Sequence, residues 1–530
     1  MSDADPIALV GGRVLVARDH RLETSEAVLI RDGLIQAVGS ETEIREKAAG
    51  TTEFRDLDGR TVVPGFVDAH IHPIFYGLSL DGVPCLPPRV SSVADLRREV
   101  ARRAAEAPDG AWIWGQGYDD TRLEERRHPR REDLDDVSGG RPVVLTRVCG
   151  HMCVANARAL ELAGVDSRTP DPPGGRIERD ANGEPTGLLL ESAEELVLQH
   201  VIHGRGAVER AIGRASEDLL RHGITSCCDA WLGYTDGQDE REVWIDAIGS
   251  GAFRPGISFL AHHSVWQEDP DRYAAGPLDV IGVKLVADGS VSGGSAGVAE
   301  PFHDDDDKRL FVYDPDELRG ICADVASRDL VVAIHAMGDA AISMALDAIE
   351  ASGPPNVGNR IEHCTLPKPA DIDRMARLGI TAVMQPIFLF AEGEAYRSKL
   401  GEERSRRANP ARAMLDAGVS VALGSDAPAT TWGEPTDVLL GIETSAVRRT
   451  WAGNGLGKEQ ATTVEEAILG YTLIAARAAG LAVTRGSIEP GKRADLAVLS
   501  EDPLHTPPED LHRIEITATV LGAEVVFGEL

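Results

Sequence analysis

The chain has 530 residues and a formal net charge of −32, and 42% of its residues are hydrophobic. This length predicts more than one domain, and the hydrophobic content excludes global disorder. A surface this acidic repels phosphate backbones, which disfavours a nucleic-acid partner. No apolar run of about 18 residues occurs, and the first residues lack the basic and apolar regions of a signal peptide. The seven cysteines are scattered along the chain, which fits a reducing compartment. Together with the missing apolar run and signal features, this leads us to expect a cytoplasmic protein with no membrane contact.

Both ends of the chain carry short alternating segments that are typical of β-strands. Residues 7–60 alternate apolar and polar side chains between turn pairs such as Asp32-Gly33 and Asp58-Gly59. Residues 486–520 repeat the same pattern. The simplest interpretation is one small β-sandwich domain, built from residues 1–60 and 481–530, into which the rest of the chain is inserted.

The middle of the chain alternates apolar, β-branched runs with stretches of helical pattern. Eight runs stand out: Val62–Asp68, Gly223–Asp229, Ile257–His262, Ile281–Ala287, Val331–His335, Arg360–His363, Ile380–Met384 and Val419–Leu423. Eight strands joined by crossovers predict an α/β fold that closes into a TIM-like (β/α)8 barrel, which we assign to residues 61–480. The long stretch after the first run, residues 76–205, is expected to be an insertion or lid with its own strand at Pro142–Val148.

Four histidines fall at the ends of the predicted barrel strands. His70 and His72 close the first run, and residues i and i+2 of a strand point to the same side. His335 and His363 end the fifth and sixth runs. Active sites of such barrels lie at the carboxyl ends of the strands, so the four imidazoles are expected to converge and bind a divalent metal.

Two further side chains complete the predicted site. Asp426 follows the eighth run, where a carboxylate can bind metal and accept a proton from water; capping of the next helix is the alternative. Lys284 lies inside an apolar run, where an unpaired ammonium is costly, and only seven of the 54 basic residues are lysine. Reaction with CO2 would convert this lysine to a carbamate that bridges two cations. An ion pair with Asp288, or a cation lining the pocket, is the alternative.

Several motifs together carry a family resemblance. They are Pro64–His72, His335–Asp339, Arg360–Cys364 and Leu423–Pro428, with further matches at 114–119, 150–156, 283–290 and 486–495. The set resembles the amidohydrolase superfamily, in particular its amidohydrolase-3 or YtcJ-like branch, and spans nearly the whole chain. The resemblance implies a homodimer and one or two divalent ions, with zinc as the expected metal. The implied ligands are His70, His72, Lys284, His335, His363 and Asp426.

The expected reaction is hydrolysis of a C–N amide-type bond in a small organic substrate, with an N-substituted formamide as one candidate. Metal-activated water would attack the carbonyl carbon, and Asp426 would pass the water proton to the leaving amine. Alternatives on the same scaffold are hydrolysis of a cyclic imide, carbamate or ester, and ring deamination. A non-catalytic barrel used for assembly is the alternative from another class. Substrate contacts are expected from His151, Trp114, Tyr118 and Gln385.

Overall fold

The protein folds into two compact units in its computed structural model. The structure describes residues 6–18, 21–48, 50–108, 110–120, 122–148, 152–172, 175–191, 193–201, 205–233, 240–274, 276–303, 309–353 and 358–530. One unit comprises Met1–His72, Ser216–Ala427 and Thr436–Leu530, and the other comprises Pro73–Ala215 and Pro428–Pro435. Within the described ranges, no helix is long and apolar enough to cross a membrane.

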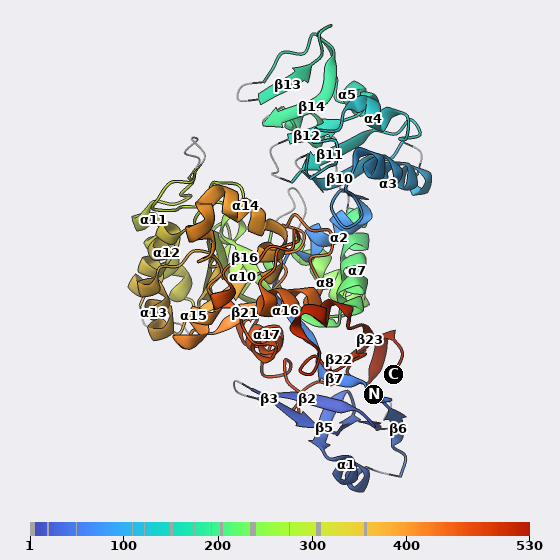
Figure 1. Ribbon diagram of the computed structural model, residues 1–530, viewed down its shortest axis with the longest axis vertical. Coiled ribbons are helices and arrows are strands. Elements are labelled where there is room, and N and C mark those ends of the chain that lie inside the picture. The colour runs from blue at the N-terminus through green and yellow to red at the C-terminus, as the bar shows by residue number, and fades with distance from the viewer. Residues whose placement is uncertain are drawn as a thin grey trace. The chain divides into compact units, whose positions relative to one another are not determined.

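The centre of the first unit is a nearly closed, eight-stranded parallel sheet, as predicted (Figure 1). Its strands are β8 (Phe66–Ile71), β15 (Ile224–Leu232), β16 (Gly256–His262), β17 (Val280–Val286), β18 (Val331–Ala336), β19 (Arg360–His363), β20 (Thr381–Met384) and β21 (Val421–Leu423). They lie in chain order from β8 to β21. The segment after β21 returns to β8 through two backbone hydrogen bonds, from Asp426 N to His70 O (2.7 Å) and from His72 N to Ala427 O (3.0 Å). The carboxyl ends of the first and last strands are thereby joined.

The run expected as one strand at Val62–Asp68 is divided in the structure. β7 (Thr61–Pro64) joins a sheet of the chain ends, and the barrel strand β8 begins only at Phe66. Gly65 separates them, and a side chain there would bring its Cβ within 2.2 Å of Thr225 Oγ1. Close packing of the barrel against this turn therefore requires glycine, and the chain leaves one sheet for the other at this residue.

Helices follow most of the barrel strands. They are α7 (Arg205–Arg221), α8 (Glu240–Ser250), α9 (His263–Trp266), α10 (Pro270–Ala274), α11 (Pro315–Ala326), α12 (Asp339–Ala351), α13 (Pro369–Leu378), α14 (Pro386–Ser405), α15 (Ala411–Asp416), α16 (Val438–Val447), α17 (Val464–Gly470) and α18 (Leu473–Ala478). Apolar side chains of α18 share one buried cluster with barrel residues such as Val67 and Leu260. Burial of this apolar surface is the main force that holds helices on the sheet.

Strands from both ends of the chain pair in one sheet of the first unit. The six-stranded sheet has the order β24 (Glu524–Gly528), β23 (Ile516–Leu521), β22 (Leu496–Leu499), β7, β2 (Arg13–Arg18) and β3 (Arg21–Ser25). A four-stranded sheet has the order β5 (Leu34–Gly39), β4 (Ala27–Arg31), β1 (Ile7–Val10) and β6 (Glu53–Asp56), and α1 (Glu41–Lys47) follows β5. Side chains from both sheets, including Leu9 and Val62, form one buried cluster.

The second unit has its own six-stranded sheet. Its order is β13 (Gly175–Arg179), β14 (Pro185–Glu191), β12 (Met152–Ala155), β11 (Val143–Arg147), β10 (Ile113–Tyr118) and β9 (Val83–Pro84). The helices of this unit are α2 (Pro73–Asp81), α3 (Val93–Glu106), α4 (Arg131–Asp135), α5 (Ala157–Leu162) and α6 (Glu195–Leu198). Strand β11 corresponds to the strand expected at Pro142–Val148.

Candidate metal centre

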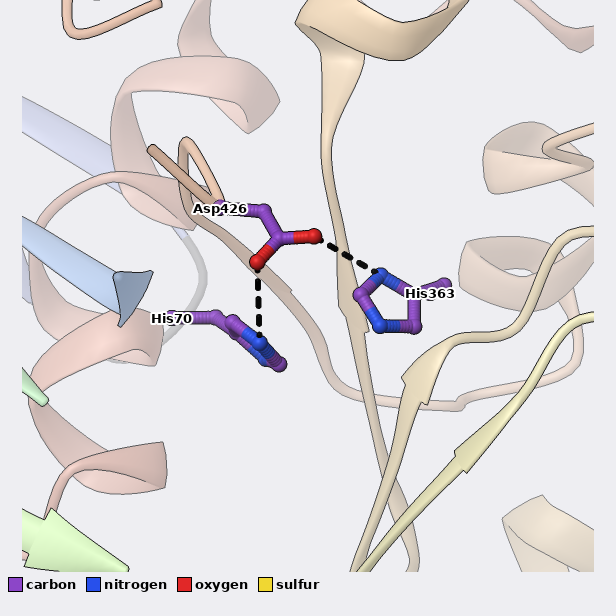
Figure 2. Close-up of side chains that lie close together, drawn as sticks. All are labelled: His70, His363 and Asp426. Carbon is purple, nitrogen blue, oxygen red and sulfur yellow. Dashed lines mark ion pairs between the residues drawn. The ribbon is translucent and has the colours of Figure 1, made fainter. Parts of the chain in front are cut away.

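Three side chains from three barrel strands form a compact cluster of metal-binding groups (Figure 2). His70 comes from β8, His363 from β19, and Asp426 follows β21. One potential ligand atom from each lies within 4.8 Å of the others, and all three residues are buried. Asp426 stands between the rings, with Oδ1 at 3.3 Å from His70 Nε2 and Oδ2 at 3.8 Å from His363 Nδ1. The strand ends expected to converge do meet.

Unusual backbone geometry aims two of these side chains. His363 has φ +65° and Asp426 has φ +54°, both in the left-handed region that non-glycine residues rarely adopt. Within β19, alternation alone would place Glu362 and His363 on opposite faces. The left-handed turn at the end of the strand instead leaves the His363 ring 4.9 Å from the His70 ring. Backbone outliers of this kind cluster at functional sites, which makes this strand end a candidate active site.

The other predicted ligands lie around this cluster. His72 Nε2 is 2.9 Å from Asp426 Oδ1. Lys284 is 1% exposed, and its Nζ lies 3.4 Å from His70 Nε2. The ring of His335 lies 4.4 Å from that of His363. The structure therefore brings all six predicted metal-site residues to one place.

Two of the alternative roles, an ion pair of Lys284 with Asp288 and helix capping by Asp426, do not match the contacts. A buried ammonium that lines the pocket agrees with the contact between Lys284 and His70. Asp288 accepts hydrogen bonds from the backbone N–H groups of Gly297, Met337 and Gly338, at 2.8 to 3.0 Å, and within the described part of the chain it makes no ion pair with Lys284. The next long helix after β21, α16, is capped by Asp437, whose side chain accepts from Leu440 N. Asp426 is thus available to the histidines.

A buried ion pair supports His70 from inside the barrel. Glu362 contacts His70 Nδ1 and also pairs with Arg360 two residues earlier on β19. Arg360 donates as well to the backbone oxygens of Ala69 (2.7 Å) and Ala478 (3.0 Å). A carboxylate on one ring nitrogen fixes the tautomer of a histidine and leaves the other nitrogen to face a metal. Neither residue is among the predicted site residues, although the sequence shows two opposite charges at i and i+2 of an apolar run, a spacing that places both on one face of a strand.

Burial favours the neutral form of three imidazoles at this site, those of His72, His335 and His363. It lowers the pKa of His335 to about 4 and holds the pKa of His363 well below its ordinary value. The pKa of His72 is lowered for the same reason. Neutral imidazole is the form that binds metals. These three imidazoles can therefore bind a cation at neutral pH without first losing a proton.

The acids and the lysine respond differently to the same burial. Burial alone would raise the pKa of Asp426, but His70 and His72 hold that pKa well below its ordinary value. Arg360 and His70 do the same for the pKa of Glu362. Burial lowers the pKa of Lys284 to about 8. Two ionised carboxylates and a partly neutral amine thus surround the imidazoles.

The residues expected to contact substrate are spread over the chain. Gln385 Oε1 lies 2.8 Å from His363 Nδ1, so this side chain touches the histidine cluster directly. Trp114 and Tyr118 lie on β10 of the second unit, where Tyr118 is fully buried and its hydroxyl is 3.1 Å from His128 Nδ1. His151 lies outside the described residues.

The donor set fits a divalent cation. Neutral imidazoles with a carboxylate are the ligands that zinc and related ions prefer. His72 Nδ1 is buried and has no hydrogen-bond partner among the described residues. Buried polar atoms rarely stay unpaired, so this nitrogen is consistent with a ligand for a cation. His70, His363 and Asp426 would hold one ion, and His72, His335 and Lys284 stand close enough to complete its shell or a second one.

The sequence and the fold agree on the family. The model of the amidohydrolase family, Amidohydro_3, matches residues 53–527. The chain is 33% identical to YtcJ of Bacillus subtilis, covering 95% of this chain and 96% of that protein. It is also 33% identical to N-substituted formamide deformylase of Arthrobacter pascens, covering 94% of each. An uncharacterised metal-dependent hydrolase from Pyrococcus horikoshii matches with a TM-score of 0.76 and 26% identity, over 95% of this chain and 99% of that structure.

The barrel and its histidine cluster thus define an enzyme of the metal-dependent hydrolase class. The chain belongs to the amidohydrolase family, in agreement with the resemblance read from its motifs. Membership supports hydrolase activity for this protein.

Proposed function

We propose that this protein hydrolyses a C–N amide-type bond in a small organic substrate, and that an N-substituted formamide is the first substrate to test. The observation that carries the proposal is the cluster of His70, His363 and Asp426, with ligand atoms within 4.8 Å at the carboxyl ends of barrel strands. Similarity to a formamide deformylase over nearly the whole chain supports this choice of substrate.

In the proposed mechanism His70, His363 and Asp426 hold a divalent ion, with zinc as the expected metal. Such an ion lowers the pKa of a coordinated water to about 7 and polarises a carbonyl oxygen. Asp426 is ionised because its pKa is held low, so it is available to accept the water proton and to return it to the leaving amine. Glu362 holds His70 in place during both transfers.

The other three predicted ligands, His72, His335 and Lys284, each have a role in the proposed site. His72 contacts Asp426 and steadies the carboxylate between proton transfers. His335 and Lys284 would help to hold one or two ions, and a carbamate formed at Lys284 would supply them with a carboxylate ligand. The assignment of residues 1–60 and 481–530 to a β-sandwich, the lid role of residues 76–205, the cytoplasmic location and the homodimer stay predictions.

The direct test is a substrate screen with the zinc- and manganese-loaded protein. N-formyl and N-acyl amines, cyclic imides and esters are compared, and we expect turnover of the amides. Asp426→Asn keeps the side-chain volume but removes the proton acceptor, so the rate is expected to fall about 10²- to 10⁴-fold. The matched control is Asp416→Asn, the same change at a surface carboxylate that pairs with Arg412.

Two results would overturn the proposal. Turnover confined to esters or other non-amide substrates would contradict the reaction class. Unchanged turnover in Asp426→Asn, at wild-type metal content, would remove this residue from the chemistry and favour another centre.

A further inference from the structure

A cavity in the first unit is lined in part by Gln385, the residue that contacts His363. It has a volume of about 30 Å³ and is bordered by the ends of β20 and β21 and by helices α14, α15, α16 and α17. A water-sized species requires about 10–15 Å³ by this measure, so the cavity has room for a monatomic ion or about two waters. None of the six predicted metal-site residues lines it.

Four of the residues that line this cavity each have a polar side-chain atom with no hydrogen-bond partner among the described residues. These atoms are Gln385 Nε2, Asn409 Nδ2, Thr444 Oγ1 and Thr462 Oγ1. Gln385 and Thr444 are each 2% exposed. Buried polar groups in native proteins are nearly always hydrogen-bonded, because leaving one unpaired is costly. Four such atoms around one cavity indicate that the cavity holds a polar species.

A buried positive charge borders the same cavity. Arg448 is 3% exposed and donates to the backbone oxygens of Leu456 (2.9 Å), Asn409 (2.9 Å) and Ala408 (2.7 Å). Within the described part of the chain, no carboxylate oxygen lies within 4 Å of its guanidinium. Buried charges are normally paired with an opposite charge. Glu459 favours the charged form of Arg448 from a longer distance, so among the described residues the guanidinium has no counter-charge in direct contact.

The rest of the wall adds no free negative charge. Glu466 lines the cavity, but both of its carboxylate oxygens lie 2.8 Å from Arg412 Nη1. Gln385 and Pro386 open the long helix α14, and the N-terminal end of a helix carries a partial positive charge. Arg412 thus balances the charge of Glu466, and the end of α14 adds a partial positive charge beside Arg448.

We propose that this cavity is a binding site for a small monovalent anion of the size of chloride. Two of the unpaired atoms are amide nitrogens that can only donate, and the two threonine hydroxyls can turn to donate as well. An anion accepts from all four groups and supplies the counter-charge for Arg448. Water molecules would satisfy some of the hydrogen bonds but would leave the guanidinium without an opposite charge.

Occupancy of this site would reach the histidine cluster through one side chain. Gln385 lines the cavity and has an unpartnered Nε2, and its Oε1 lies 2.8 Å from His363 Nδ1. A bound anion accepts from Nε2 and so fixes the amide in the orientation that keeps Oε1 on His363. The anion would thereby help to orient one of the residues that we expect to bind the metal.

Bromide provides the direct test, because its anomalous scattering distinguishes it from water. Crystals of the full-length protein grown in bromide are expected to show an anomalous peak within hydrogen-bond distance of Gln385 Nε2 and Thr444 Oγ1. The same crystals of Thr444→Val, which keeps the side-chain shape without the hydroxyl, are expected to lose most of this peak. A cavity that contains only ordered water in the wild-type protein overturns the proposal.

Thermal unfolding gives a second test that needs no crystal. Replacing gluconate, which is too large for the cavity, by chloride at constant sodium is expected to raise the melting temperature to a plateau, because a ligand that binds only the folded state stabilises it. Thr444→Val should lose this chloride-dependent shift. The control Thr472→Val removes a buried hydroxyl that bonds to Ile468 O and should keep it. An equal chloride response in all three proteins contradicts the anion site.

Discussion

The carboxylate of Glu362 lies against Nδ1 of His70, although the two residues are 292 positions apart in the chain. Both side chains are buried, and Arg360 on the same strand pairs with the carboxylate from the other side. His70 therefore presents Nε2 to Asp426 and Lys284 in a single orientation. The Glu362 carboxylate thus positions the His70 ring, and Arg360 of the same strand balances the charge of that carboxylate.

This contact predicts a weaker metal site in Glu362→Gln. The variant keeps the side-chain volume but loses the negative charge that fixes the tautomer of His70, and such outer contacts typically contribute about 10- to 100-fold to metal affinity. Competition with a chelator, followed by measurement of bound zinc, checks the value. Because Arg360 also loses its buried partner, unfolding in urea is measured in parallel. Wild-type zinc affinity in a folded Glu362→Gln protein would contradict the positioning role.

The strand ends of the barrel could be predicted from sequence because their signals are local. Each predicted histidine follows an apolar run, and parallel strands bring their carboxyl ends together whatever the length of the crossovers. The support of His70 could not be predicted in this way, since it depends on register between strands far apart in the chain. The same limit applies to Gly65, whose break of the first run depends on how closely Thr225 packs. The left-handed backbone of His363 could not be predicted either, because a residue other than glycine rarely has a positive φ.

A buried acid within β15, Asp229, predicts an unusual pH dependence of stability. Burial, with Glu240 nearby, raises the pKa of Asp229 from 3.8 to about 8. Between these pH values the folded state keeps a proton that the unfolded chain has lost, so stability falls as the pH rises. One pKa unit corresponds to about 1.4 kcal/mol, which makes the loss on the order of several kcal/mol.

Asp229→Asn removes this titration while keeping an oxygen to accept from Trp231 N. The free energy of unfolding in urea, measured at several pH values, should show the variant gaining on the wild-type protein as the pH rises from about 4 to about 8. Parallel profiles for the two proteins would show that Asp229 is already ionised in the folded state at low pH.

Close backbone contact beside His335 predicts a steric penalty at Gly338. A Cβ at this residue would lie 2.3 Å from the carbonyl of Gly297, while its φ of −81° is open to any residue. Gly338→Ala is therefore expected to cost about 1–3 kcal/mol through overpacking alone. Gly320→Ala is the control, because Gly320 is exposed inside α11 with nothing near its Cβ position, and it should gain about 0.5–1 kcal/mol. Urea unfolding compares the two, and equal effects would exclude the steric explanation.

The environment of Lys284 predicts that CO2 modifies it. Burial lowers the pKa of this amine to about 8, so a substantial neutral fraction exists near that pH, and neutral amine is the form that attacks the carbon of CO2 and releases a proton to solvent. Isotopically labelled bicarbonate is expected to give a carbamate signal in the metal-loaded protein, and this signal should increase as the pH rises through about 8. Lys284→Arg should lack the signal because a guanidinium does not form the carbamate. Lys492→Arg, at a lysine that contacts Glu489, should retain it. A metal-loaded wild-type protein without labelled carbamate would leave Lys284 as a buried amine beside His70, and a single metal ion would then be the simpler arrangement.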